Sequence, residues 1–280
     1  MANKKTLCAD LHIHTTFSDG VNTVDEVINQ AISNNLDIIS ITDHDCLDGS
    51  IAGMKIAENK DIKIIYGIEM SSYHNDESIH ILGYFKSLDD ACDLQRFLDI
   101  QRKKRVERAL KIRDLLKEHF NIQISEEMLL SVNSITRGHI ARCILASGYS
   151  YSKEDIFKHM IGDGCKAYLP STKLPTKQAI SMLKKANATV VLAHPVLIKK
   201  SDVQEIIDMG VDGLEAIYPL NKENDTKRLI GLAKKNNLII TAGSDFHSFN
   251  DYKHGNIGAV RLMNEDLEKF IKKVGINYGR

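Results

Sequence analysis

The chain has 280 residues, of which 43% are hydrophobic and 26% are charged, and its 37 basic residues equal its 37 acidic residues in number. This composition is typical of one ordinary globular domain with a sizeable core. The balanced charge excludes a global field that would recruit nucleic acid or a membrane surface, although bound cations would add positive charge locally.

The cysteines and the N-terminus indicate a cytoplasmic protein. The five cysteines are widely spaced, with no CxxC pair, which is typical of reduced thiols rather than a disulfide framework. Residues 1–6 are polar and lack the apolar core of a signal peptide. No stretch approaches the ~20 apolar residues that span a bilayer, so we expect no membrane partner.

Short runs rich in Ile, Val and Leu predict seven β-strands, at residues 7–13, 37–41, 62–66, 79–84, 189–193, 213–217 and 238–241. Continuous apolar runs of this kind favour a parallel sheet covered on both faces. Helical patterns separate most of them. Thr23 and Glu26 predict a capping box for a helix to about residue 34, Ser201 and Gln204 predict another for a helix ending at Gly210, and a further helix is expected at 222–236. This alternation predicts an α/β barrel.

Residues 89–187 interrupt the alternation. Helical patterns cover 89–119, 125–131, 139–146, 152–161 and 176–187, and no run in this region predicts a strand. We therefore expect a barrel formed by residues 1–88 and 188–280, with 89–187 inserted as a helical cap subdomain over the site.

Histidines and acidic residues gather where the predicted strands end, which is where barrel enzymes place their catalytic groups. The set comprises His12, His14, Asp19, His44, Glu69, His80, His194, Asp245 and His247. His12 and His14 are two residues apart on a strand, so both side chains point to one side. One such pair alone is more often a half-buried strand face. Several groups together, rich in imidazoles and carboxylates and without a thiolate, predict a site for two or three divalent ions, with manganese favoured over iron or zinc.

The motifs DLHIHT, TDHD, AHP and SDFH resemble those of the PHP (polymerase and histidinol phosphatase) family over essentially the whole chain. The resemblance implies a distorted seven-stranded, TIM-like barrel, the (β/α)7 PHP fold. It also implies three ions, the first held by His12, His14, Glu69 and Asp245. Glu69, His80 and His194 would hold the second, and Asp19, His44 and His247 the third. Glu69, Asp19 and His247 would then be catalytic.

The inserted segments 136–142 and 164–170 are similar to the cap of the TrpH-like branch, which implies activity on nucleoside 3′,5′-bisphosphates or the 5′ end of short RNA. A separate physical argument favours anion contacts here. His139 is expected to begin a helix, where free N–H groups attract phosphate, and Arg137 just before it can bind phosphate through its guanidinium fork. Arg142 lies one helical turn further on. We expect Arg137, His139 and Arg142 to contact phosphate.

Other polar residues carry two interpretations. Asp10, Asp43 and Asp45 could orient the imidazoles by hydrogen bonds or simply cap strand ends. The basic run 101–108 is more often a solvated helix face than an RNA guide. His74, His119, His159 and His254 match no motif and are expected at the surface, with a proton-transfer role for His254 left open.

The sequence thus predicts a metal-dependent phosphoesterase in which a metal-bridging hydroxide attacks a phosphate ester of a nucleotide. The partners expected are a small nucleotide or short RNA, with no obligatory protein partner. Three alternatives stay open: a histidinol-phosphate phosphatase, a metal-dependent amide hydrolase on the same barrel, and a structural barrel without activity.

Overall fold

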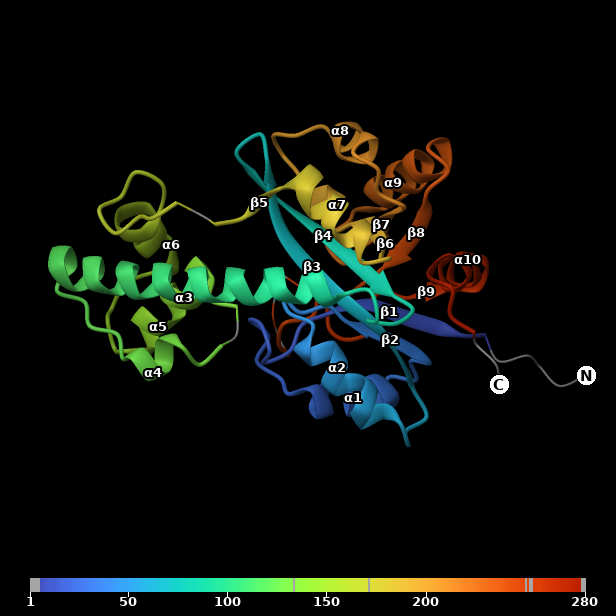
Figure 1. Cartoon of the computed structure of the whole chain (residues 1–280), viewed down its shortest axis with the longest axis horizontal. Coiled ribbons are helices and arrows are strands. Elements are labelled where there is room, and N and C mark those ends of the chain that lie inside the picture. The colour runs from blue at the N-terminus through green and yellow to red at the C-terminus, as the bar shows by residue number, and fades with distance from the viewer. Residues whose placement is uncertain (1–5, 133, 171, 250, 252–253, 278–280) are drawn as a thin grey trace, which may run out of the picture. The chain divides into compact units, whose positions relative to one another are not determined.

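The computed structural model describes residues 6–132, 134–170, 172–249, 251 and 254–277. The chain divides into two compact units, one formed by Met1–Gln95 with Lys173–Arg280 and the other by Arg96–Thr172. All strands belong to the first unit (Figure 1). None of the helices described is long and apolar enough to cross a membrane.

The first unit is built on one sheet. Its strands are β1 (Cys8–Ile13), β2 (Ile38–Ile41), β3 (Lys63–His74), β4 (Glu77–Phe85), β5 (Leu174–Pro175), β6 (Thr189–Leu192), β7 (Gly213–Ile217), β8 (Ile239–Ala242) and β9 (Leu262–Met263). The order is β8-β7-β6-β4-β3-β2-β1-β9, and β5 pairs with β3. Ile13 at the end of β1 also pairs with Phe246, which follows β8, so the sheet nearly closes into a barrel. The predicted barrel and its seven strands are confirmed, whereas the two-residue strands β5 and β9 were missed.

The expectation of a parallel sheet was wrong at β4, which is antiparallel to both β3 and β6. The cause is a tight hairpin. His74 pairs with Glu77, and the two residues between them, Asn75 and Asp76, have φ values of 48° and 54°. Two consecutive residues with positive φ make the turn whose twist matches that of paired antiparallel strands.

Helices follow most strands of this unit. They are α1 (Val24–Ser33), α2 (Asp48–Ala57), α7 (Thr176–Lys185), the 3₁₀ turn η2 (Pro195–Leu197), α8 (Val203–Asp208), α9 (Glu223–Lys235) and α10 (Asn264–Val274), whereas α3 (Cys92–Phe120) runs on into the second unit. The capping box of Thr23 and Glu26 is confirmed at α1. Asn187 ends the turn after α7 with φ 55°, where glycine would otherwise be favoured.

The capping box predicted for Ser201 was wrong. Asp202 caps α8 instead, and its carboxylate accepts the N–H of Gln204 at 2.9 Å. Ser201 is used by the β3–β4 hairpin, because its N–H donates to Glu77 and its hydroxyl donates to the carbonyl of His74.

The second unit contains the rest of α3 with α4 (Glu126–Leu129), α5 (Arg137–Ala146), α6 (Lys153–Ile156) and the π-helical turn η1 (Phe157–Ile161). It has its own apolar core, in which Ile112, Leu116, Ile140 and Ile144 are at most 1% exposed. The basic run on α3 is only partly a solvated face. Arg105 donates to Ser134, and Arg108 donates to the carbonyl of Leu169 at 2.8 and 3.1 Å, so two of its arginines hold this unit together.

Candidate metal centre

The fold brings all nine predicted ligand residues together at one end of the barrel. His12 lies on β1 and His14 directly after it, with Asp19 in the following loop. His44 follows β2 and His194 follows β6, while Asp245 and His247 follow β8. Glu69 and His80 lie inside β3 and β4, which extend further than their neighbours. The site is therefore assembled from seven segments of one unit.

Glu69 occupies the centre of this cluster and is 1% exposed. Its Oε2 lies 3.3 Å from His12 Nε2, 3.1 Å from His14 Nε2 and 2.9 Å from His44 Nδ1. Its Oε1 lies 2.9 Å from His80 Nδ1 and 3.1 Å from His194 Nε2. The two oxygens thus face two different sets of imidazoles, as a carboxylate that bridges two cations would.

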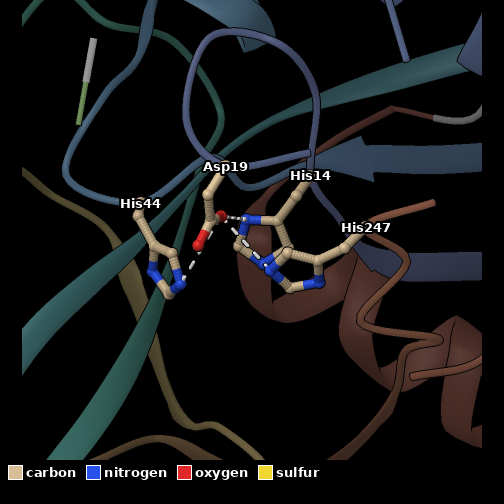
Figure 2. Close-up of side chains that lie close together, drawn as sticks. All are labelled: His14, Asp19, His44 and His247. Atoms are coloured by element: carbon tan, nitrogen blue, oxygen red, sulfur yellow. Dashed lines mark ion pairs between the residues drawn. The ribbon is translucent and has the colours of Figure 1, made fainter. Parts of the chain in front are cut away.

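A second group surrounds Asp19 (Figure 2). Its Oδ1 lies 3.2 Å from His247 Nε2 and 3.9 Å from both His14 Nδ1 and His44 Nε2. His14 and His44 therefore stand between the Asp19 group and the Glu69 group, each presenting one ring nitrogen to each carboxylate.

The chemistry of this donor set fits cations. Two sets, His12 with His14, Glu69 and Asp245, and His14 with Asp19, His44 and His247, each place one donor atom per residue within 4.8 Å of the others. The Nε2 atoms of His12 and His14 lie 3.1 Å apart, although their lone pairs would repel without a proton or cation between them. Asp19 Oδ1 and His44 Nδ1 are buried and, among the described residues, lie 3.2 Å from His247 Nε2 and 2.9 Å from Glu69 Oε2 without the geometry of a hydrogen bond. Buried polar atoms without a hydrogen bond are rare and indicate a bound ion or water.

Burial and charge pairing both change the pKa of these groups. Burial alone would lower the pKa of His12, but the carboxylates of Glu215, Glu69 and Asp245 together outweigh it and raise the pKa well above its usual value. Burial likewise raises the pKa of Glu69, yet the surrounding His44, His12 and His80 bring it well below the usual range. His80 differs, because burial lowers its pKa to about 4. Imidazoles and carboxylates of the cluster therefore stabilise one another's charged forms.

The aspartates that flank the ligand positions accept hydrogen bonds from nearby backbone N–H and hydroxyl groups. Asp10 accepts the N–H groups of Ser244 and Gly258 at 2.9 and 2.8 Å, which fixes the loop that carries Asp245 and His247. Asp43 accepts hydrogen bonds from Thr15 and Ser18 in the loop that carries Asp19, and Asp45 accepts the N–H of Ser71. Ser18 in turn lies 3.4 Å from His14 Nδ1, so Asp43 reaches a ligand-type imidazole through one hydroxyl group.

Two residues that do orient ligands were missed. Glu215 on β7 contacts His12 Nδ1 at 3.0 Å, and the hydroxyl of Tyr218 donates to Asp245 Oδ2 at 2.9 Å. The available signal was a glutamate inside the apolar run Gly213–Ile217, where a carboxylate needs a buried partner.

His254 is a quarter exposed, as His74 is, but it lies beside the cluster. Its ring stacks on His247 with centroids 4.1 Å apart, and its Nε2 lies 3.8 Å from Asp245 Oδ2. Asp251 accepts or shares the proton of its Nδ1 at 2.7 Å. His119 and His159 are exposed, and His74 is half-buried against Glu205 at 3.0 Å.

The residues predicted to contact phosphate lie in the helical unit. Helix α5 begins at Arg137 rather than at His139, and the N–H of His139 is already capped by Thr136. The ring of His139 is buried, with Nε2 3.2 and 3.1 Å from the carbonyl oxygens of Met128 and Leu129. The expectation of free N–H groups at His139 was therefore wrong. Arg137 pairs with the exposed Asp163 at 2.9 Å, and Arg142 is exposed on α5.

A barrel that gathers five or more imidazoles around buried carboxylates at one end is the architecture of a metal-dependent hydrolase. Comparison with known proteins places the chain more narrowly. The PHP domain model matches residues 10–167, and the chain belongs to the PHP domain family. It is accordingly a metal-dependent phosphoesterase.

Three similar proteins illustrate the family. The 5'-3' exoribonuclease Rnm of Salmonella typhimurium is 30% identical over 85% of this chain and 84% of its own length. The 3',5'-nucleoside bisphosphate phosphatase of Chromobacterium violaceum is 26% identical over 85% of this chain and 87% of its own. The crystal structure of a candidate metal-dependent phosphoesterase from Bifidobacterium adolescentis has a TM-score of 0.82 and 25% identity, covering 96% of this chain and 97% of that one.

Proposed function

We propose that this protein hydrolyses a phosphate ester of a nucleotide, either a nucleoside 3′,5′-bisphosphate or the 5′ end of short RNA. The observation that carries the proposal is the cluster of nine ligand-type residues around Glu69 and Asp19. The nucleotide substrate is supported by the exoribonuclease and the bisphosphate phosphatase to which the chain is similar over most of its length. The net reaction adds water across a P–O bond. A nucleoside bisphosphate would give an alcohol and inorganic phosphate, whereas an internucleotide diester of RNA would give an alcohol and a nucleoside monophosphate.

The nine residues would hold two or three divalent cations, and we propose manganese. The donors are imidazoles and carboxylates without a thiolate, which suits manganese, iron or zinc. When bound, such ions supply Lewis acidity, and with it a nucleophile at neutral pH and charge stabilisation at phosphorus. Glu69 would lie between the two sets of imidazoles that face its two oxygens. Asp19, with His44 and His247, would hold the third ion.

We retain Arg137 and Arg142 as candidate phosphate contacts and leave His139 out of that set. The guanidinium of Arg137 is 32% exposed and its ion-pair partner Asp163 is 79% exposed. An exposed pair of this kind contributes little stability, so phosphate can replace the aspartate at small cost. Replacing Arg137 with alanine should raise the KM for a nucleotide substrate more than it lowers kcat.

The test is manganese-dependent phosphate release from adenosine 3′,5′-bisphosphate by the wild type and by Asp19→Ala. Loss of charge stabilisation worth several kcal/mol should lower the rate by roughly a hundredfold or more. Asp25→Ala is the matched control, because Asp25 is 57% exposed at the start of α1, pairs with Lys60 and belongs to none of the groups that could hold an ion.

Parallel reactions with 5′-phosphorylated short RNA and with histidinol phosphate separate the remaining substrates. Release of phosphate from the nucleotide, or of nucleoside monophosphates from the RNA, abolished by Asp19→Ala, supports the proposal. Release from histidinol phosphate alone, or equal rates for the wild type and Asp19→Ala, contradicts it.

A further inference from the structure

We propose that Glu215 is a positioning residue that fixes the ring of His12 and the backbone of His194 at the same time. Glu215 would thereby fix the positions of two proposed metal ligands, His12 for the first ion and His194 for the second. The inference rests on the proposed metal function and extends it to a residue outside the nine ligand positions.

Glu215 lies on β7 and is fully buried. A carboxylate removed from water is costly unless its oxygens are hydrogen-bonded. Here both oxygens have partners: Oε1 is 3.0 Å from His12 Nδ1, and Oε2 accepts the N–H of His194 at 2.8 Å. Because both oxygens have these partners and Glu215 belongs to none of the described groups that could hold an ion, we assign it to the support of the ligands and not to the ligands themselves.

The contact with His12 selects one form of its imidazole. An ionised carboxylate can only accept hydrogen bonds, so Nδ1 of His12 must carry the proton. The Nε2 of the same ring is then the nitrogen that would bind a cation, and it lies 3.3 Å from one oxygen each of Glu69 and Asp245. Carboxylates that fix the orientation and protonation of metal-bound histidines commonly change metal affinity by about 10- to 100-fold.

The contact with His194 holds an uncommon backbone. His194 has φ 28° and ψ 62°, a region that residues with a side chain rarely adopt. This conformation turns the chain from β6 into η2 and places His194 Nε2 3.1 Å from Glu69 Oε1. The hydrogen bond from the His194 N–H to Glu215 therefore stabilises the geometry that brings this ring into the cluster.

The first test is manganese binding, by calorimetric titration, to Glu215→Gln. A glutamine amide presents one acceptor and one donor group, so it cannot accept both protons that Glu215 accepts. We expect the affinity for manganese to fall by about 10- to 100-fold. Ser72→Ala is the matched control, since Ser72 is also fully buried in the barrel but bonds only to Ile79 and Thr176 in the described contacts.

A merely structural role would lower the unfolding temperature without a specific change in metal affinity. Unchanged manganese affinity in Glu215→Gln overturns the proposal. So does a loss of affinity that Ser72→Ala reproduces at an equal loss of stability. If the wild type itself binds no divalent cation, the proposed function falls as well, and the two failures are thereby distinguished.

A second measurement does not depend on the variant folding. In wild-type protein loaded with zinc and labelled with ¹⁵N-histidine, the Nδ1 of His12 should be protonated and its Nε2 should not. The opposite pattern at His12 overturns the proposal.

Discussion

Gly243→Ala should disable the metal centre although Gly243 is not one of its ligands. The residue follows β8 and lies against β1. A Cβ atom added there would stand 2.2 Å from His12 Cβ, 2.5 Å from Glu215 Oε1 and 2.9 Å from the His12 nitrogen. Carbon atoms in contact prefer about 3.5–4.0 Å, so the end of β8 and the start of the site must separate by more than about 1 Å.

Two magnitudes follow from this displacement. Overpacking of a core costs about 1–3 kcal/mol, and each kcal/mol lowers the Tm of a large domain by roughly 2–4 °C. A misplacement of about 1 Å in a catalytic geometry can reduce the rate by about a hundredfold. We therefore expect a Tm several degrees lower, and a larger relative loss in manganese-dependent phosphate release.

The assay is thermal unfolding together with phosphate release, and Gly231→Ala is the control. Gly231 lies in α9, and a Cβ there would have no atom within 4 Å. Alanine in a helix is favoured over glycine by roughly 0.5–1 kcal/mol, so this variant should be slightly more stable and fully active. Wild-type Tm and wild-type activity in Gly243→Ala would refute the close approach of β8 to His12.

Three further predictions concern the hydrogen bond to Asp245, the ion pairs of Asp212 and the removal of metal ions. Tyr218→Phe removes the hydroxyl that donates to Asp245, and should weaken manganese binding by about tenfold in a titration; equal affinity would contradict this role. Burial raises the pKa of Asp212, but hydrogen bonds from Lys184, the backbone and Lys273 bring it below 3.8. Its stabilising effect is thus present above the unfolded pKa and lost as pH falls through the folded one. Asp212→Asn should cost about 1–2 kcal/mol at pH 7 by urea unfolding, after allowance for the half-exposed lysines, and this cost should shrink as the pH falls below about 4. A constant difference across that range would contradict the assignment. Chelation of metals should lower the Tm, because free metal at 100 times Kd contributes about 2.7 kcal/mol per site; an unchanged Tm would exclude a structural contribution from cations.

The sequence alone determined where the strands of the barrel lie and which residue types follow them. Apolar runs of four to seven residues are too short for a typical helix and suit strands buried on both faces, and each of the seven predicted runs overlaps a strand. Because such strands share one barrel, side chains at their ends approach one another whatever their separation along the chain. His14, His44 and Asp245 could therefore be grouped from the sequence, although they lie on three different segments.

Predictions from short sequence patterns were wrong where residues outside the pattern determine the local structure. Ser201 has the residue type and spacing of a helix cap, but Glu77 on the β3–β4 hairpin takes its N–H. His139 was expected to offer a free N–H at the start of a helix, yet Thr136 caps it and its ring is buried in the helical core. The antiparallel direction of β4 depends on a two-residue turn whose effect is invisible in the apolar pattern.

The support of the metal centre was decided only by the tertiary structure. Glu215 is separated from His12 by 203 residues and from His194 by 21, and it carries no motif of its own. His254 was set at the surface by its sequence, whereas folding stacks it on His247. Most candidate metal ligands can be recognised in the sequence because they are His, Asp or Glu residues near the end of a predicted strand. The groups that orient them depend on which side chains meet in the closed barrel, and only the packing of β7 and β8 against β1 determines that.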